Sequence, residues 1–198
     1  MKILVAGATG NTGIRVMHKL NSSAHQPIAM VRKTSDTSNL PTGAKQRTAD
    51  LTDLPKGICD DCDAVVFAAG SGGDTDAEMT DKVDREGAKA LIDQASAANV
   101  KRFVMLSSAG AEDPDPDTEM GHYLQAKHDA DEHLSKSGLS FAIVRPVGLT
   151  DESGDGNMRF GDEVVVDATA ARGDVATVLA DAVDSAEWHN KVDRMQSV

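Results

Sequence analysis

The sequence predicts an α/β protein with a doubly wound parallel sheet, arranged in three layers (α/β/α) within one domain. Three observations support this. Short apolar runs alternate with stretches of helical period, a glycine-rich turn follows the first apolar run, and 198 residues suit one complete core. The alternation is typical of repeated βα units, because a crossover helix usually joins two parallel strands. We therefore expect a single domain over residues 1–198.

The expected elements follow in order along the chain. We expect strands at 2–6, 27–31, 45–48, 64–68, 101–106 and 140–145, most of them apolar runs, with a short last strand at 192–196. Helical periodicity predicts helices near 11–21, 79–98, 120–137 and 172–186. Polar loops at 70–78, 110–119 and 150–163 follow the carboxyl ends of strands, which is the edge where open α/β sheets bind ligands.

Charge and hydropathy exclude several classes of protein. The net charge of −12 argues against nucleic acid and anionic membrane surfaces as partners, because both need clustered Lys and Arg. No run approaches the roughly 20 apolar residues of a membrane span, and the first strand leaves no room for a signal peptide. These observations predict a cytoplasmic protein that is a monomer or homodimer. The acidic surface fits salt adaptation or ordinary solubility equally well.

The cysteines and histidines do not predict a metal or redox site. Cys59 and Cys62 enclose two aspartates, which would raise thiol pKa values rather than lower them, so we expect an inert turn before a strand. His128 and His133 are five residues apart and fall on different faces of a helix. We therefore expect no bound metal.

A glycine loop lies between the first predicted strand and the first predicted helix. Its three glycines, Gly7, Gly10 and Gly13, allow a tight turn, close approach to a pyrophosphate and close packing of helix on strand. The helix N-terminus adds free N–H groups and the positive end of its dipole. This position predicts a Rossmann-type dinucleotide site, with contacts from these glycines and from Thr9, Asn11 and Thr12.

The end of the second strand indicates which dinucleotide is preferred. NAD-specific sites place an acidic residue there for the ribose 2′-hydroxyl, but none occurs between Gly13 and Asp36. The strand instead ends in Arg32 and Lys33, which suit a 2′-phosphate. We therefore expect NADP(H) to be preferred, with NAD(H) possible. The alternative is a solvated basic pair at a strand end.

Several motifs in order resemble the atypical short-chain dehydrogenase/reductases, specifically the small NmrA-like or epimerase-like NAD(P)H-binding proteins. The resemblance covers nearly the whole chain and rests on Gly7-x-x-Gly10-x-x-Gly13, Arg32, Ala49-Asp50-Leu51, Phe67-Ala68-Ala69-Gly70, the run 100–108, Tyr123-x-x-x-Lys127, and the run 144–149. The chain departs from the larger sugar epimerases of this superfamily at Ala109, where those enzymes often carry a third hydroxyl residue.

The resemblance implies further cofactor contacts. Asp50 and Leu51 are expected to border the adenine. Ala68, Ala69 and Gly70 are expected to pass beneath the adenine-proximal ribose and the pyrophosphate. The nicotinamide end is assigned to the remaining residues of this set, Pro146, Val147 and Lys127.

Tyr123 and Lys127 carry the predicted chemistry. They are four residues apart on one helix face, and a Lys ammonium near a phenol favours the phenolate form. Tyr123 could then donate a proton to the alkoxide formed by hydride transfer, while Lys127 also binds the ribose. Ser108 is expected to polarise the carbonyl, with Ser107 as its substitute. The alternative for Tyr123 is an aromatic packing residue.

These features predict an NADP(H)-dependent reductase of a small carbonyl, quinone or flavin-like acceptor. Two alternatives remain: a non-catalytic NADP(H)-sensing regulator of NmrA type, and an NAD-dependent epimerase/dehydratase-like enzyme. A minimal substrate-side segment is expected at about 147–170, with a glycine-containing lid at 150–163. The rim is expected to carry acidic residues from three loops: Asp74, Asp76, Glu112, Asp113, Asp115, Asp117, Asp151, Glu152 and Asp155.

Overall fold

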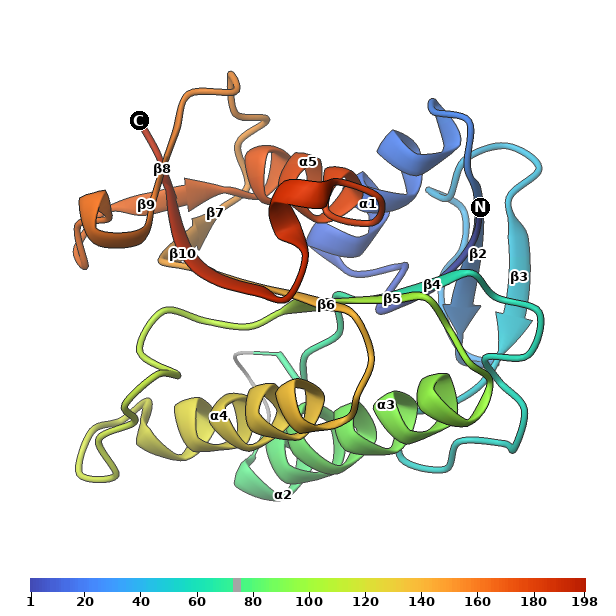
Figure 1. Ribbon diagram of the computed structural model, residues 1–198, viewed down its shortest axis with the longest axis horizontal. Helices are drawn as coiled ribbons and strands as arrows, with labels where there is room; N and C mark the ends of the chain where they lie inside the picture. The colour runs from blue at the N-terminus through green and yellow to red at the C-terminus, as the bar shows by residue number, and fades with distance from the viewer. Residues whose placement is uncertain (73–75) are drawn as a thin grey trace.

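The computed structural model describes residues 1–72 and 76–198, and an eight-stranded sheet forms its centre (Figure 1). The strand order is β3-β2-β1-β4-β5-β6-β10-β8, and every pairing is parallel except that of β8 with β10. In that order, the strands span Lys45–Thr48, Gln26–Val31, Lys2–Ala6, Ala64–Phe67, Arg102–Leu106, Phe141–Pro146, Lys191–Ser197 and Met158–Phe160. From β1 the sheet extends to β2 and β3 on one side and to β4, β5 and β6 on the other, which confirms the doubly wound arrangement.

Helices cover both faces of the sheet, and this confirms three layers (Figure 1). On one face α1 (Asn11–Asn21) packs against α5 (Arg172–Asp181). The other face carries α2 (Ala77–Thr80), the π-helical segment η1 (Asp81–Gly87), α3 (Ala88–Ala97) and α4 (Gly121–Lys136). The predicted helix at 79–98 is therefore one helical stretch that contains seven π-helical residues.

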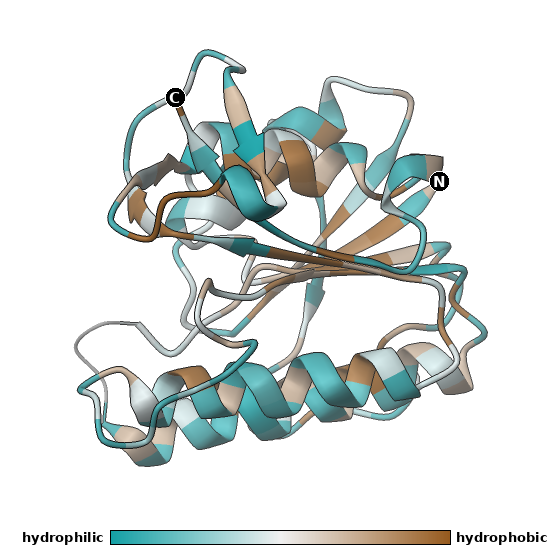
Figure 2. Cartoon of the chain, turned by 60° about the vertical axis from the view of Figure 1, so that its left-hand side comes forward, coloured by the Kyte–Doolittle hydropathy of each residue, from teal (hydrophilic) through white to brown (hydrophobic). Residues whose placement is uncertain are grey.

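Alternate residues of the central strands belong to two hydrophobic clusters, one on each face of the sheet. Ile3 and Val5 of β1 join the cluster beneath α1 and α5, whereas Leu4 and Ala6 join the cluster beneath α3 and α4. Figure 2 shows the apolar strands between helices whose outer faces are polar. Because both faces are covered, the central strands β1, β4, β5 and β6 are largely apolar, which is why they are easy to recognise in the sequence.

The segment after β6 has more structure than predicted. β7 (Gly148–Thr150) pairs with β9 (Thr169–Ala171), and the predicted loop at 150–163 contains β8 and a 3-10 turn, η2 (Gly161–Glu163). A second 3-10 turn, η3 (Ala186–Trp188), precedes β10. The residues of β7 and β8 are half-buried or exposed, so these strands contain no long apolar run that would reveal them in the sequence.

The expected lid is anchored to α5. The buried Asp174 accepts hydrogen bonds from the backbone of Gly156, at 3.0 Å, and from Ser197 Oγ, at 2.6 Å. A Cβ atom at Gly173 would lie 1.7 Å from the carbonyl oxygen of Ser153, so backbone packs directly on backbone there. Gly154 and Gly173 therefore serve close packing, whereas an added Cβ atom at Gly156 would meet no atom within 4 Å.

No helix within residues 1–72 and 76–198 is both long enough and apolar enough to cross a membrane.

Candidate cofactor and active site

The glycine loop follows β1 at the carboxyl edge of the sheet. Gly7 has a φ of +77°, and a Cβ atom there would lie 2.6 Å from the Cα atom of Ala69. A Cβ atom at Gly13 would lie 2.0 Å from the carbonyl oxygen of Gly7. Both glycines are therefore required by the fold itself, because neighbouring backbone fills the space that a side chain would need.

Gly10 is different, because the fold gives no reason for a glycine there. It is exposed, its φ is −78°, and the nearest atom to an added Cβ would be the carbonyl oxygen of Gly7, at 3.4 Å. In the described chain no side chain caps α1, and its first turn carries no acidic residue. The open space and the uncapped N–H groups fit a dinucleotide pyrophosphate.

The other predicted contacts in the loop differ in exposure. Asn11 is exposed and Thr9 is half-buried, whereas Thr12 is 5% exposed.

The adenine side of the predicted site gathers at the ends of β2 and β3. Arg32 and Lys33 are exposed beyond β2, and Asp50 follows β3. Hydrogen bonds from the backbone and side chain of Thr52 lower the pKa of Asp50, and the nearby charge of Arg32 adds to this effect. The structure therefore brings Arg32 and Asp50 close together.

Leu51 packs against the π-helical segment. A Cβ atom at Gly87 would lie 2.9 Å from the Cβ atom of Leu51. The predicted residues after β4 run beside the glycine loop: Ala68 donates its N–H to the carbonyl of Ala6, Ala69 contacts Gly7, and Gly70 is exposed.

Lys127 connects this edge to α4. Its side chain is 3% exposed, and its Nζ atom lies 3.5 Å from the carbonyl oxygens of both Ala69 and Leu106, at the ends of β4 and β5. The same atom lies 5.6 Å from the ring centre of the half-buried Tyr123. Burial lowers the pKa of Lys127, but Tyr123 and Asp84 outweigh burial and raise it overall, so the ammonium stays charged.

Asp84 is a site residue that the sequence analysis missed. Its Oδ1 atom lies 2.9 Å from Lys127 Nζ, its Oδ2 atom accepts the backbone N–H of Ser71, and its side chain is fully buried. It comes from η1, and π-helical turns are frequent at functional sites. A signal was present: Asp84 stands four residues from Thr80 and Ala88 on an otherwise buried helical stripe.

The two predicted serines after β5 have different surroundings. Ser107 is 4% exposed, and its Oγ atom donates to Asp131 Oδ2 at 2.7 Å. Ser108 is half-buried, and its Oγ atom donates to the carbonyl of Ala109 at 3.2 Å.

The end of β6 lies beside this turn. Pro146, which is buried, accepts the N–H of Ala109 at 2.9 Å. Val147 is 6% exposed and donates its N–H to the carbonyl of Met195. Ser107, Ser108, Pro146 and Val147 therefore lie together at the carboxyl edge, as predicted for strands that end in register.

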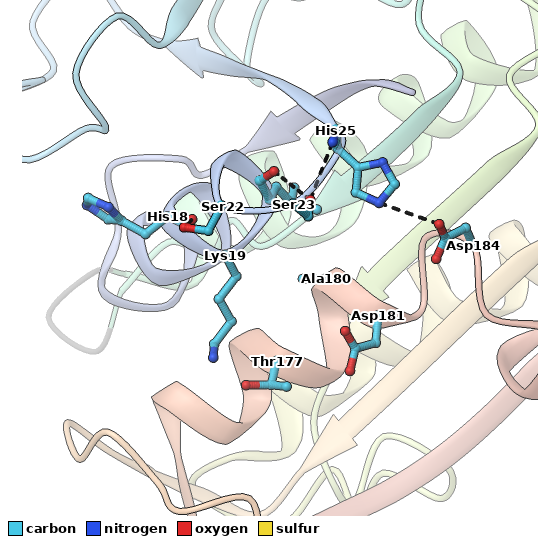
Figure 3. A pocket seen from close by; sticks show the side chains of 10 residues that line it. His18, Lys19, Ser22, Ser23, His25, Thr177, Ala180, Asp181 and Asp184 are labelled. Carbon is cyan, nitrogen blue, oxygen red and sulfur yellow. Dashed lines mark hydrogen bonds and ion pairs between the residues drawn. The ribbon is translucent and has the colours of Figure 1, made fainter.

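Two cavities lie away from the glycine loop. A cavity of about 470 Å³ lies between the C-terminal ends of α1 and α5, where Lys19 extends towards Thr177 and His25 pairs with Asp184 at 3.5 Å (Figure 3). A second, of about 360 Å³, is lined by Arg145 and its neighbours. Neither cavity is lined by a described residue of the glycine loop. The first cavity is open to solvent and lined by both acidic and basic side chains. We therefore place the candidate site at the glycine loop and Lys127, not in either cavity.

The cysteines lie in the predicted turn before β4. Both are buried, and burial is the main reason that the pKa of Cys59 rises to about 12. Burial also raises the pKa of Cys62. The two histidines of α4 have separate partners: His128 contacts the carbonyl of Ala111, and His133 contacts Asp93. No group of three or more metal-binding side chains occurs among the described residues.

Comparison with known proteins agrees with this geometry. A family model described as NAD(P)H-binding matches residues 7–186. The uncharacterized sugar epimerase YhfK of Bacillus subtilis (strain 168) is 37% identical over 131 residues, which cover 66% of this chain and 61% of that protein. A further relative, from Schizosaccharomyces pombe, is likewise matched over only 61% of its length.

Two solved structures share the whole fold. A protein from Bacillus halodurans, provisionally described as an NAD-dependent epimerase/dehydratase, is 36% identical and has a TM-score of 0.91, covering 100% of this chain and 94% of that one. The oxidoreductase ylbE from Lactococcus lactis is 29% identical, with a TM-score of 0.86 over 100% of this chain and 91% of that one. This chain therefore belongs to the NAD(P)H-binding family of Rossmann-fold proteins, among relatives of epimerase/dehydratase and oxidoreductase type.

Proposed function

We propose that the protein is an NADPH-dependent reductase of a small carbonyl, quinone or flavin-like acceptor. The observation that carries this proposal is the position of Lys127, a buried ammonium 5.6 Å from the Tyr123 ring centre and 3.5 Å from the carbonyl of Ala69, which contacts the glycine loop. A packing role for Tyr123 needs no buried cation beside it. A bound nicotinamide would supply the hydride.

The residues divide the remaining work. Tyr123 donates a proton from its hydroxyl to the acceptor oxygen, and Lys127 provides the positive charge that makes this donation easier and binds the ribose. Asp84 holds Lys127 in place, because its Oδ1 atom is 2.9 Å from Nζ. Ser108 donates a hydrogen bond to the acceptor carbonyl and polarises it.

Arg32 and Lys33 support the preference for NADPH. A 2′-phosphate held by charge-assisted hydrogen bonds gains roughly 1.5–3 kcal/mol, so about ten- to a hundredfold should separate the affinities for NADPH and NADH. Calorimetric titration measures both. Arg32→Ala should reduce this ratio, whereas Arg159→Ala, an exposed arginine on β8, should not. Equal affinities in the unmodified protein contradict the preference.

The acidic rim favours neutral or cationic acceptors over polyanionic ones. The acidic rim residues that follow β5 and β6 are all exposed: Glu112, Asp113, Asp115, Asp117, Asp151, Glu152 and Asp155. Asp76 is also exposed, and Asp74 lies outside the described residues. The substrate-side segment, 147–170, includes the β7–β9 pair and presents part of this rim. The discrimination should weaken as salt is added.

A turnover assay tests the function as a whole. NADPH oxidation is followed with an aldehyde, a quinone such as phenanthrenequinone, and a free flavin, and NADPH affinity is measured in parallel. A reductase consumes NADPH with at least one of these acceptors. Tight binding without consumption by any of them favours a sensor of the NADP redox state instead.

A further inference from the structure

A second buried carboxylate lies one helical turn beyond Lys127 on α4. Asp131 is 2% exposed, and its Oδ2 atom accepts two hydrogen bonds: from Ser107 Oγ, at 2.7 Å, and from Arg145 Nε, at 3.0 Å. One oxygen atom therefore joins the end of β5, the middle of α4 and the end of β6. Its other oxygen, Oδ1, is buried and has no hydrogen-bond partner among the described residues.

Stability alone does not explain this group. Buried ion pairs are often no more stabilising than apolar residues of similar volume, because the charges lose their hydration. Burial raises the pKa of Asp131 despite the opposing effects of Arg145 and Ser107, which shows that this environment disfavours the charge. What the group does provide is a fixed direction for the hydroxyl of Ser107.

The backbone shows why that direction matters for the neighbouring serine. Ser107 donates its N–H to the carbonyl of Val144 at 2.8 Å, and Ala109 donates to the carbonyl of Pro146 at 2.9 Å. The residue between them, Ser108, is therefore held from both sides. The hydroxyl of Ser107 is occupied by its hydrogen bond to Asp131 on the α4 face. Of the two serines, Ser108 is therefore the one that remains partly exposed to solvent.

We infer that Asp131, held by Arg145, is a positioning residue that fixes the turn at 107–109, so that Ser108 and not Ser107 meets the acceptor. This inference rests on the proposed reductase function for its catalytic consequence. Asp131 touches neither acceptor nor cofactor in this role and acts through the serines.

A double-mutant cycle separates positioning from a general structural role. Asp131→Asn should lower kcat by about 10- to 100-fold with NADPH and phenanthrenequinone, because a small misplacement of a donor has a large effect on rate. NADPH affinity should change by less than about twofold. In a Ser108→Ala background the same substitution should lower kcat no further. Equal, additive losses in both backgrounds overturn the inference.

Two further variants guard against loss of folding. Ser107→Ala removes only the hydroxyl that Asp131 binds, and it should reproduce the effect of Asp131→Asn in weaker form. The matched control is Asp129→Asn, on the same helix, where a partly exposed carboxylate contacts Arg85 at 3.4 Å. Asp129→Asn should leave kcat unchanged. A loss in the control equal to that of Asp131→Asn contradicts a specific role.

Hydrogen–deuterium exchange tests the same idea without turnover. The amides of residues 107–109 should exchange at least about tenfold faster in Asp131→Asn and Ser107→Ala than in the unmodified protein, with α1 unchanged. Unchanged exchange at 107–109 overturns the inference even if the enzyme is active. If the unmodified protein consumes no NADPH, the reductase proposal fails. Faster amide exchange at 107–109 in the two variants would then still show that Asp131 fixes this turn.

Discussion

The glycine loop and the inner face of α4 meet at the same edge of the sheet, but they are built in opposite ways. The loop is formed by backbone, with Gly7 and Gly13 packed so closely that a Cβ atom would overlap their neighbours. The face of α4 is formed by buried charges, Lys127 and Asp131, each paired with a partner from another element. The loop can be recognised from residues adjacent in sequence, although Gly7 also packs against the distant Ala69, whereas the charged pairs of α4 cannot be recognised without their distant partners.

This difference predicts which changes affect chemistry, stability and binding. Changes on α4 should separate turnover from cofactor binding. Changes in the loop should separate binding from folding. Three pairs of substitutions test the contrast, from the largest expected effect to the smallest.

Tyr123→Phe should lower turnover by on the order of 10²–10⁴ while NADPH affinity barely changes, because only the proton-donating hydroxyl is lost. The measurement is kcat by NADPH oxidation alongside calorimetric affinity. Lys127→Ala should weaken both quantities, since Lys127 is assigned to the ribose and to the phenol. Full activity in Tyr123→Phe would mean that Tyr123 is a packing residue and that protons come from solvent or the acceptor.

Asp84→Asn should destabilise the protein by about 3–5 kcal/mol, because it leaves the buried Lys127 ammonium without its counter-ion. Asp81→Asn is the matched control in the same π-helical segment. Its carboxylate is 33% exposed and pairs with Arg85 and His122, so its loss should cost about 0–1 kcal/mol. Urea denaturation measures both values. Similar losses in the two variants would show that burial of Asp84 has no special role.

The same pair of variants should differ in pH dependence. The pKa of Lys127 is raised in the folded protein, so its contribution to stability persists below the unfolded pKa and is lost only as pH rises through the raised value. Without the Asp84 carboxylate, burial lowers the pKa of Lys127 with less opposition. As pH rises, NADPH affinity of Asp84→Asn should therefore begin to weaken at a lower pH than that of Asp81→Asn.

Gly10→Ala should fold normally yet bind NADPH about 10- to 100-fold more weakly, because its Cβ atom has room in the fold but would enter the space that we assign to the pyrophosphate. Gly13→Ala should instead fail to fold stably, since its Cβ atom would lie 2.0 Å from a carbonyl oxygen. Thermal melts and calorimetry distinguish the two. Unchanged affinity in Gly10→Ala would place the ligand elsewhere.

Local patterns made most of the fold predictable. The six strands before the substrate-side segment agree with prediction to within one residue at each end. Five of them are largely apolar because helices cover both faces of the sheet, whereas the edge strand β3 is polar and mostly exposed. The helix after Gly10 was equally clear. The loop glycines could be assigned because β1, the turn and α1 are adjacent in the chain.

The unpredicted features depend on distant partners. Asp84 belongs to the candidate site because it pairs with Lys127, which lies 43 residues later in the chain. One aspartate in a helical pattern does not reveal that pairing. The π-helical turn that carries it also shifts the helical register locally. β8 consists of three residues and exists only because β10 returns beside it. The inferred role of Ser108 rather than Ser107 rests on the position of Asp131, which the sequence does not reveal.

The inert cysteine turn offers an experimental opportunity. Cys59 and Cys62 are the only cysteines in the sequence, both are buried, and both have raised pKa values, so thiol-directed dyes should react with neither at neutral pH. One cysteine introduced at the exposed Asp155 would then carry a fluorophore at a single known place. The unmodified background therefore provides a site-specific optical reporter of the substrate-side segment without first removing any native thiol.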